Sequence, residues 1–248
     1  MNALGLPDAI RACLFDLDGV LTQTAKVHAA AWKQMFDEFL RRWAARTGQP
    51  FVAFDQDDYD RYVDGKPRYD GVASFVASRG ISLPEGTHAD PPDAETIGGL
   101  GNRKNELVLR LIHDHGVEAY PGSVRYVHAV IDAGLAKAVV SSSTNTHDVL
   151  AAAGLGGLFD VVVDGHVAEQ RHLRGKPAPD TFLAGAELLG VAPQEAAVFE
   201  DALAGVEAGR AGTFGHVVGV DRVGQAAELK EHGADVVVHD LEELLSLG

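Results

Sequence analysis

Cysteine is almost absent from this 248-residue chain. The single cysteine, Cys13, lies inside an apolar run and has no second thiol with which to form an intramolecular disulfide. We therefore expect it to pack as a small buried side chain. A sequence without a disulfide framework is typical of a reducing compartment, so the cytoplasm is the expected location.

Long hydrophobic runs are lacking as well. No stretch approaches the roughly 20 apolar residues that a membrane-spanning helix requires. Residues 1–8 have neither the basic start nor the apolar centre of a signal peptide. Both absences predict a soluble protein that stays inside the cell.

Positive charge is scarce, because 21 Lys and Arg stand against 36 Asp and Glu and the net charge is -15. Nucleic acid and anionic membranes are therefore not expected as partners. An acidic protein can still bind a phosphate ester if its site is locally positive. Such a site needs a metal ion or a few Lys and Arg side chains gathered in one place.

The hydrophobic content of 46% suffices for one large core, or for a core with a smaller accessory domain. Short continuous apolar runs, typical of strands buried on both faces, occupy residues 12–15, 136–140, 159–163, 196–199, 216–220 and 234–238. Helical patterns that end at Gly or open with Pro lie between them, at 148–154, 179–190 and 202–211. This alternation predicts an α/β fold, a Rossmann-like parallel sheet with helices on both faces.

Residues 24–120 have a different pattern. Helical stretches are expected at 25–47, 68–79 and 103–115, and no buried-strand run occurs among them. We predict an all-helical cap domain at 24–120, inserted into an α/β core made of 1–23 and 121–248. Such an insert could open and close over a site on the sheet.

Two carboxylates follow the first apolar run. In the segment Phe15-Asp16-Leu17-Asp18-Gly19, Asp16 and Asp18 are spaced by two, so on an extended chain they share a face. The carboxyl ends of parallel strands are where open α/β sheets bind ligands. Two neighbouring carboxylates repel each other, and oxygen ligands favour a hard cation such as Mg²⁺. The alternative is a solvated Asp-x-Asp-Gly loop without a ligand.

Three further strand ends carry polar groups. Glu200 and Asp201 follow the fourth strand, Ser141 to Asn145 follow the second, and Lys176 precedes a Pro-Ala-Pro segment. Taken singly, each has an ordinary alternative: a helix cap at Asp201, a capping turn at 141–145, and a surface lysine. Parallel strands would bring all of them to one edge of the sheet, where the metal and the lysine supply the local positive charge.

This order of motifs resembles the haloacid dehalogenase superfamily of phosphotransferases, and within it the β-phosphoglucomutase group, which has a helical cap. The similarity continues in the insert at Thr24-Ala25, His28, Ala31-Trp32-Lys33, Asp64-Gly65-Lys66 with Arg68, Arg103-Lys104-Asn105 and Tyr120-Pro121-Gly122. The chain departs from the pattern at Gln23 and Asp64, and at Thr144, where the family often has Lys. It also has extra length at 48–60 and 83–96.

The resemblance implies a role for each matched residue. Asp16 would be the nucleophile, Asp18 the general acid and base, and Ser141, Ser142 and Lys176 would hold the transferring phosphoryl group. Asp16, Asp18 (through its backbone carbonyl), Glu200 and Asp201 would bind Mg²⁺. Arg68 would receive the second phosphate of a bisphosphate intermediate. The sugar pocket would comprise Thr24, His28, Trp32, Gly65, Lys66 and Lys104 from the insert and Ser143, Thr144 and Asn145 from the core.

The implied activity is a phosphomutase that interconverts β-D-glucose 1-phosphate and β-D-glucose 6-phosphate through an aspartyl-phosphate and glucose 1,6-bisphosphate. A sugar-phosphate phosphatase with the same nucleophile is the alternative, and a metal-binding regulatory protein without turnover is a third. A dehalogenase is disfavoured because it would need neither the Mg²⁺ carboxylates nor Asp18. The expected partner is a small sugar phosphate, and we expect a monomer.

Overall fold

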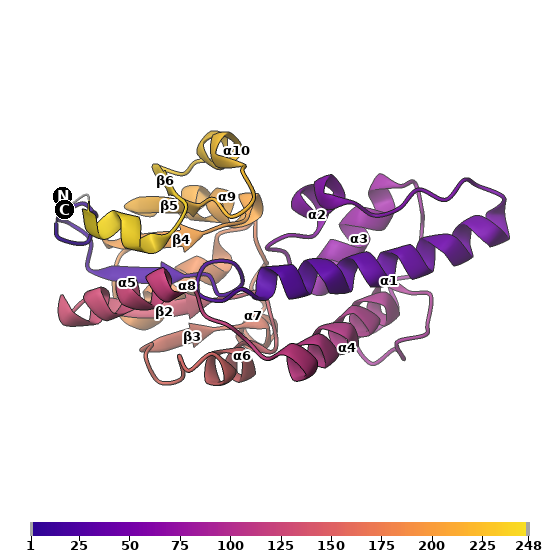
Figure 1. Ribbon diagram of the computed structural model, residues 1–248, viewed down its shortest axis with the longest axis horizontal. Coiled ribbons are helices and arrows are strands. Elements are labelled where there is room, and N and C mark those ends of the chain that lie inside the picture. Colours follow the sequence, from indigo (N-terminus) through magenta and orange to yellow (C-terminus); the bar gives the residue numbers. More distant parts are fainter. Residues whose placement is uncertain (1, 247–248) are drawn as a thin grey trace. The chain divides into compact units, whose positions relative to one another are not determined.

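The computed structural model describes residues 2–246 and contains a six-stranded, fully parallel sheet in the order β3-β2-β1-β4-β5-β6 (Figure 1). The strands are β1 (Ala12–Phe15), β2 (Ala136–Val140), β3 (Val161–Val163), β4 (Ala196–Glu200), β5 (His216–Val220) and β6 (Val236–Val238). The chain leaves the central β1 toward β2 and β3 and then returns to the other side for β4. The strand order therefore reverses at β1, and this topological switch point is where open α/β sheets bind ligands.

All six predicted runs form strands, which confirms the predicted parallel sheet. The third and sixth strands begin two residues later than predicted. In both places an aspartate precedes the strand, and its carboxylate accepts a backbone N–H of the neighbouring strand. Asp160 accepts from Lys137 (2.9 Å) and Asp235 from Val217 (2.8 Å). A side chain thus replaces a carbonyl of the ladder at these two strand starts.

Helices cover both faces of the sheet, as predicted. The α-helices of this part are α5 (Pro121–Asp132), α6 (Thr146–Ala152), α7 (Gly165–Gln170), α8 (Asp180–Leu189), α9 (Leu203–Ala211) and α10 (Ala226–Glu231), with 3-10 turns η1 (Pro193–Glu195) and η2 (Leu241–Ser246). Leu14 of β1 belongs to a buried cluster with Phe182 of α8 and Val206 of α9. The next residue, Phe15, makes an edge contact with Tyr126 of α5. Because successive strand residues point to opposite faces, α5 lies opposite α8 and α9.

Residues 24–116 form a second compact unit, separate from the unit made by the described residues up to Gln23 and from Val117 onward. Its regular elements are all helices: α1 (Thr24–Thr47), α2 (Gln56–Tyr62), α3 (Arg68–Ser78) and α4 (Ile97–His115). Its core joins Trp32, Phe36, Phe54 and Phe75 in a chain of ring contacts. Across residues 2–246, no helix has the length and apolarity that crossing a membrane demands.

Two features of the helical unit were not predicted. Helix α2 is short, and its start depends on a capping box between Asp55 and Asp58. Helix α4 begins at Ile97, six residues before the predicted start, with Thr96 accepting the N–H of Gly99. Glycine weakens a helical pattern in the sequence. Here Gly98 and Gly99 allow close approach to the backbone at Thr87 and Ala94.

Candidate active site

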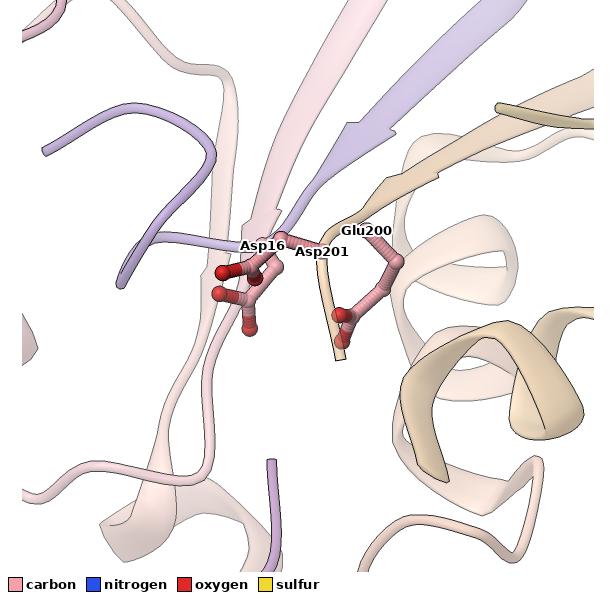
Figure 2. Close-up of side chains that lie close together, drawn as sticks. All are labelled: Asp16, Glu200 and Asp201. Carbon is pink, nitrogen blue, oxygen red and sulfur yellow. The ribbon is translucent and has the colours of Figure 1, made fainter. Parts of the chain in front are cut away.

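The polar residues predicted at the strand ends lie together at one edge of the sheet. Asp16 follows β1, Glu200 ends β4 and Asp201 follows it, and all three side chains are buried. Figure 2 shows their carboxylates extending past the ends of the strands. One oxygen of each lies within 4.8 Å of the others. Parallel pairing of β1 with β4 produces this convergence, because Phe15 is in register with Phe199.

Lys176 joins two of these carboxylates. Its Nζ donates to Asp16 Oδ1 (2.5 Å), to Glu200 Oε1 (2.6 Å) and to the carbonyl of Val140 (3.1 Å). All three donor positions of the ammonium are therefore used. The Lys176 side chain is 1% exposed. The structure thus excludes the alternative of a solvated surface lysine. The prediction that Lys176 lies at a strand end is wrong, because α7 follows β3 and Lys176 lies in the loop between α7 and α8.

Burial and charge act in opposite directions at this cluster. Burial would lower the pKa of Lys176, but the facing carboxylates of Asp16 and Glu200 outweigh it and raise that pKa above the ordinary value. Burial raises the pKa of Asp16 well above its usual range. Lys176 opposes this rise, and the carboxylates of Glu200 and Asp18 add to it. Lys176 therefore remains protonated, and the site has an excess of acidic groups.

The donor set fits a hard divalent cation. Asp16, Glu200 and Asp201 supply oxygen atoms only, which suits Mg²⁺. When ionised, these three carboxylates exceed the single charge of Lys176 by two, so a divalent cation would neutralise the cluster. Glu200 is already engaged on both oxygens, since Lys176 donates to Oε1 and the Ala202 N–H to Oε2 (2.9 Å). A second lone pair on each oxygen still leaves Glu200 able to coordinate.

Two glycines allow the carboxylates to sit where they do. Gly19 has φ +98°, and a Cβ there would overlap the carboxylate of Asp201. A Cβ at Gly205, in the first turn of α9, would overlap the carboxylate of Glu200. Asp18 lies between Asp16 and Gly19, is half-buried, and forms an isolated bridge with Thr22. The loop after β1 is therefore packed directly against the motif that follows β4.

The hydroxyl turn after β2 begins with a buried serine. Ser141 Oγ accepts the N–H of Ser143 (3.1 Å), and Ser143 Oγ accepts the N–H of Asn145 (3.1 Å). Ser142, Thr144 and Asn145 are half-buried in the same turn. Ser141 and Lys176 are brought together at the end of β2, since Lys176 donates to the carbonyl of Val140.

Several residues expected to bind substrate gather within the helical unit. Lys104 Nζ lies 3.0 Å from His28 Nδ1 and 4.9 Å from the centroid of the Trp32 ring. The Arg68 guanidinium lies 5.5 Å from the Tyr69 ring centroid. The side chains of Arg68 and Tyr69 both pack against Gly101, in the space that a Cβ at this position would occupy. Gly101 lies one turn before Lys104 on α4.

The remaining predicted residues of this unit have clear local roles. Lys66 Nζ donates to Ser74 Oγ (3.2 Å) and to the carbonyl of Arg61 (3.3 Å). Gly65 has φ +70°, a left-handed backbone conformation that suits glycine. Thr24 is buried at the first position of α1. Their part in substrate binding stays a prediction.

Sequence reasoning missed a segment that contacts this site from the end of β5. Arg222 donates to the carbonyl of Gly19 (2.8 Å), and Gln225 donates to the carbonyl of Asp201 (3.0 Å). The signal was present, because Asp221 and Arg222 directly follow an apolar strand and Gln225 lies in the same loop. The same strand-end reasoning that found Asp16 and Asp201 applies to them.

Comparison with known proteins agrees with this geometry. The family model described as haloacid dehalogenase-like hydrolase matches residues 10–213. A protein of Mycobacterium bovis named β-phosphoglucomutase is 59% identical, with 98% of this chain and 95% of the relative covered. Hexitol phosphatase A of Escherichia coli is 31% identical, with 93% and 91% covered.

A solved structure has the same architecture. The crystal structure of β-phosphoglucomutase from Clostridium difficile matches with a TM-score of 0.73 and 27% identity, covering 95% of this chain and 93% of that one. The family match extends from β1 through α9 and so includes the motifs after β1, β2 and β4 and the Lys176 loop between α7 and α8. By its fold, its strand-end motifs and these similarities, the chain belongs to the haloacid dehalogenase-like hydrolase family, in which it is similar to β-phosphoglucomutases.

Proposed function

We propose that this protein is a Mg²⁺-dependent phosphomutase that interconverts β-D-glucose 1-phosphate and β-D-glucose 6-phosphate. The observation that carries the proposal is the buried cluster of Asp16, Lys176, Glu200 and Asp201 at the sheet edge. The 59% identity to a relative named β-phosphoglucomutase supports the choice of substrate. The proposed setting is the cytoplasm, and the proposed form is a monomer.

Asp16 is the proposed nucleophile. Its carboxylate attacks phosphorus of the bisphosphate, the bond to the leaving sugar oxygen breaks, and an aspartyl-phosphate remains. Asp18 protonates the leaving oxygen and later removes the proton from the hydroxyl that attacks the aspartyl-phosphate. Ser141 and Lys176 stabilise the phosphoryl oxygens between the two transfers. Lys176 does so through its positive charge, because its three donors are directed at Asp16, Glu200 and the carbonyl of Val140. Asp18 lies two residues from the nucleophile and is half-buried, as a group that exchanges protons with substrate requires.

Mg²⁺ bound by Asp16, Glu200, Asp201 and the carbonyl of Asp18 would neutralise negative charge on the phosphoryl oxygens. The protein's own contribution is rigidity. Lys176 holds Asp16 and Glu200 in fixed positions. The backbone N–H of Asp16 donates to the carbonyl of Phe199 (2.9 Å). Positioned charge of this kind supplies most of the catalysis in phosphoryl transfer.

We propose that the helical unit is the cap domain and recognises the sugar and the phosphate that is not transferred. Arg68 would bind that phosphate with its planar guanidinium. The sugar contacts would come from His28, Trp32 and Lys104, of which Lys104 contacts the other two. Thr24, Gly65, Lys66, Ser142, Ser143, Thr144 and Asn145 complete the proposed substrate-binding set.

Phosphorus NMR tests the proposal directly. The protein is incubated with β-glucose 1-phosphate, Mg²⁺ and a trace of glucose 1,6-bisphosphate. Glucose 6-phosphate is the expected product. Inorganic phosphate as the main product would instead identify the second candidate, a sugar-phosphate phosphatase. That candidate has one observation in its favour, the 31% identity to a hexitol phosphatase over nearly the whole chain.

Substitution of Arg68 separates the two activities. Arg68→Ala should lower kcat/KM for the mutase reaction by about 10- to 100-fold, which is the loss expected for charge-assisted hydrogen bonds to a phosphate. Hydrolysis of p-nitrophenyl phosphate, which has no second phosphate, should change by less than about threefold on the same reasoning. Arg110→Ala is the matched control, because Arg110 is an exposed arginine of the same unit. Equal losses in both reactions would contradict the role of Arg68.

Removal of the metal should inactivate the enzyme. In excess chelator, turnover should fall by at least about 100-fold, because the loss of a metal's charge removes several kcal/mol of transition-state stabilisation. Added Mg²⁺ should restore activity and also raise the melting temperature, since it binds the folded state. A coupled glucose 6-phosphate assay and differential scanning fluorimetry measure the two effects. Full activity in chelator would exclude the proposed metal site.

A further inference from the structure

The segment Asp221–Gln225, which follows β5, is a rigid part of the fold. The Asp221 carboxylate is buried, and its Oδ1 accepts the N–H groups of Val223 (3.2 Å), Gly224 (2.6 Å) and Gln225 (2.9 Å). The N–H of Asp221 donates to the carbonyl of Val238 at the end of β6 (2.8 Å). The backbone of this segment is therefore anchored to the sheet on one side and folded around its own carboxylate on the other. The Cα atoms from which its side chains extend are therefore fixed in position.

Arg222 extends from this segment to the loop that carries Asp18. Its Nε donates to the carbonyl of Gly19 (2.8 Å), and its Nη2 lies 3.4 Å from the carbonyl of Val20. Its Nη1 donates to the carbonyl of His239 (2.6 Å), and the guanidinium lies 3.6 Å from the centroid of the Tyr120 ring. The side chain is 14% exposed. A guanidinium held on several sides is a stiff support, because its donors are coplanar.

Gln225 contacts the second acidic motif. Its Nε2 donates to the backbone carbonyl of Asp201 (3.0 Å), whose carbon is bonded to the Cα from which the Asp201 side chain extends. The backbone of the first loop also lies against the side chain of the second motif, since a Cβ at Gly19 would overlap the Asp201 carboxylate. A small shift of either loop would therefore change the spacing between Asp18 and Asp201. Displacements of about 1 Å can cost up to about 100-fold in rate.

We propose that Arg222 and Gln225 are positioning residues that hold the Asp18 loop and Asp201 in register from the end of β5. They act through the backbone carbonyls of Gly19 and Asp201 and do not touch the reacting atoms. The proposal rests on the proposed function only in that Asp18 and Asp201 work in one site. It adds the end of β5 to the ends of β1, β2 and β4 and to the α7–α8 loop that carries Lys176.

The test uses the full chain and three variants. Arg222→Met removes the donors and retains an unbranched apolar side chain, and Gln225→Met does the same at the second position. Arg125→Met is the control, because Arg125 forms an exposed ion pair with Glu242 in the same unit. Three quantities are measured: kcat and KM for the mutase and for p-nitrophenyl phosphate, Mg²⁺ affinity by calorimetry, and hydrogen exchange of the peptide spanning residues 17–22.

Each variant should have a distinct signature. Arg222→Met should lower kcat by about tenfold with KM changed less than about threefold, and it should speed exchange at residues 17–22. Gln225→Met should weaken Mg²⁺ binding by about tenfold, as expected for loss of a support behind a metal ligand. Arg125→Met should match the wild type in all three. Wild-type kcat and exchange in Arg222→Met, or wild-type Mg²⁺ affinity in Gln225→Met, would overturn the assignment for that residue.

The experiment remains decisive if Arg222→Met does not fold or if the proposed substrate is wrong. If circular dichroism shows that Arg222→Met is unfolded, Arg222→Lys replaces it, because Lys keeps a cation near Tyr120 without the planar fork. A kcat at least about threefold below wild type then supports the proposal, and an unchanged kcat overturns it. Calorimetry and hydrogen exchange require no sugar. They therefore decide the inference even if the wild-type protein makes no glucose 6-phosphate, a result that would reject only the proposed function.

Discussion

Asp16→Asn is expected to abolish turnover and leave the fold intact. An amide has the shape of a carboxylate but cannot attack phosphorus, so kcat should fall by at least about 10⁴-fold, as when a nucleophile is removed from other covalent catalysts. The neutral side chain is also easy to accommodate. Lys176 keeps its contact with Glu200 at 2.6 Å, and the amide oxygen can still accept from Lys176.

The same substitution should not reduce stability. Burial raises the pKa of Asp16, so in the metal-free protein the ionised form costs folding free energy once the pH is above the ordinary aspartate range. The amide removes that cost. In chelator at neutral pH the melting temperature of Asp16→Asn should therefore equal or exceed that of the wild type. Mg²⁺ should raise it less than in the wild type, because one ligand charge is gone.

Asp132→Asn is the matched control, since it makes the same chemical change at an exposed position of α5. Its turnover and melting temperature should equal those of the wild type. Intact-mass spectrometry should accompany both variants, because deamidation of the new Asn would regenerate the nucleophile. Wild-type-like turnover in verified Asp16→Asn protein would reject the aspartyl-phosphate mechanism.

Lys176→Met should damage both stability and activity. It leaves the buried carboxylates of Asp16 and Glu200, each within 2.6 Å of the lost ammonium, without their cation. Breaking a buried pair in this way costs about 3–5 kcal/mol. For a domain of this size, that corresponds to a fall in melting temperature of about 6–20 °C. Loss of the phosphoryl-binding charge should lower kcat by about 10²- to 10³-fold.

Two further variants make this prediction sharper. Lys137→Met breaks the ion pair with Asp160, whose side chain is 49% exposed, and should cost less than about 1 kcal/mol. Adding Asp16→Asn to Lys176→Met removes one of the two unpaired carboxylates and should recover part of the lost stability. Thermal unfolding in chelator measures both effects. A Lys176→Met protein that melts with the wild type, or a double variant less stable than Lys176→Met alone, would contradict the assigned charge balance.

The sequence alone predicted which core positions next to strand ends belong to the proposed site. Asp16, Ser141 and Glu200 each directly follow an apolar run, and Asp201 comes next after Glu200. Parallel strands place such positions at one edge whatever the details of packing. The strands themselves were predictable for the same local reason, since continuous Val-rich runs suit a sheet covered on both faces. The sequence analysis missed the helices α2, α5, α7 and α10 and the first turns of α4, and it placed Lys176 at a strand end. Its other errors lay at the ends of elements.

Only the tertiary structure decided which of these groups touch. The sequence separates Lys176 from Asp16 by 160 positions, and neither periodicity nor spacing shows that one ammonium bonds Asp16, Glu200 and the Val140 carbonyl together. Arg222 and Gly19 are 203 positions apart in the sequence. The hydrogen bond between them is accepted by a backbone carbonyl, so no side-chain motif reveals it. Strand ends are a consequence of local pattern, whereas distances between them depend on the register, twist and packing of the whole sheet.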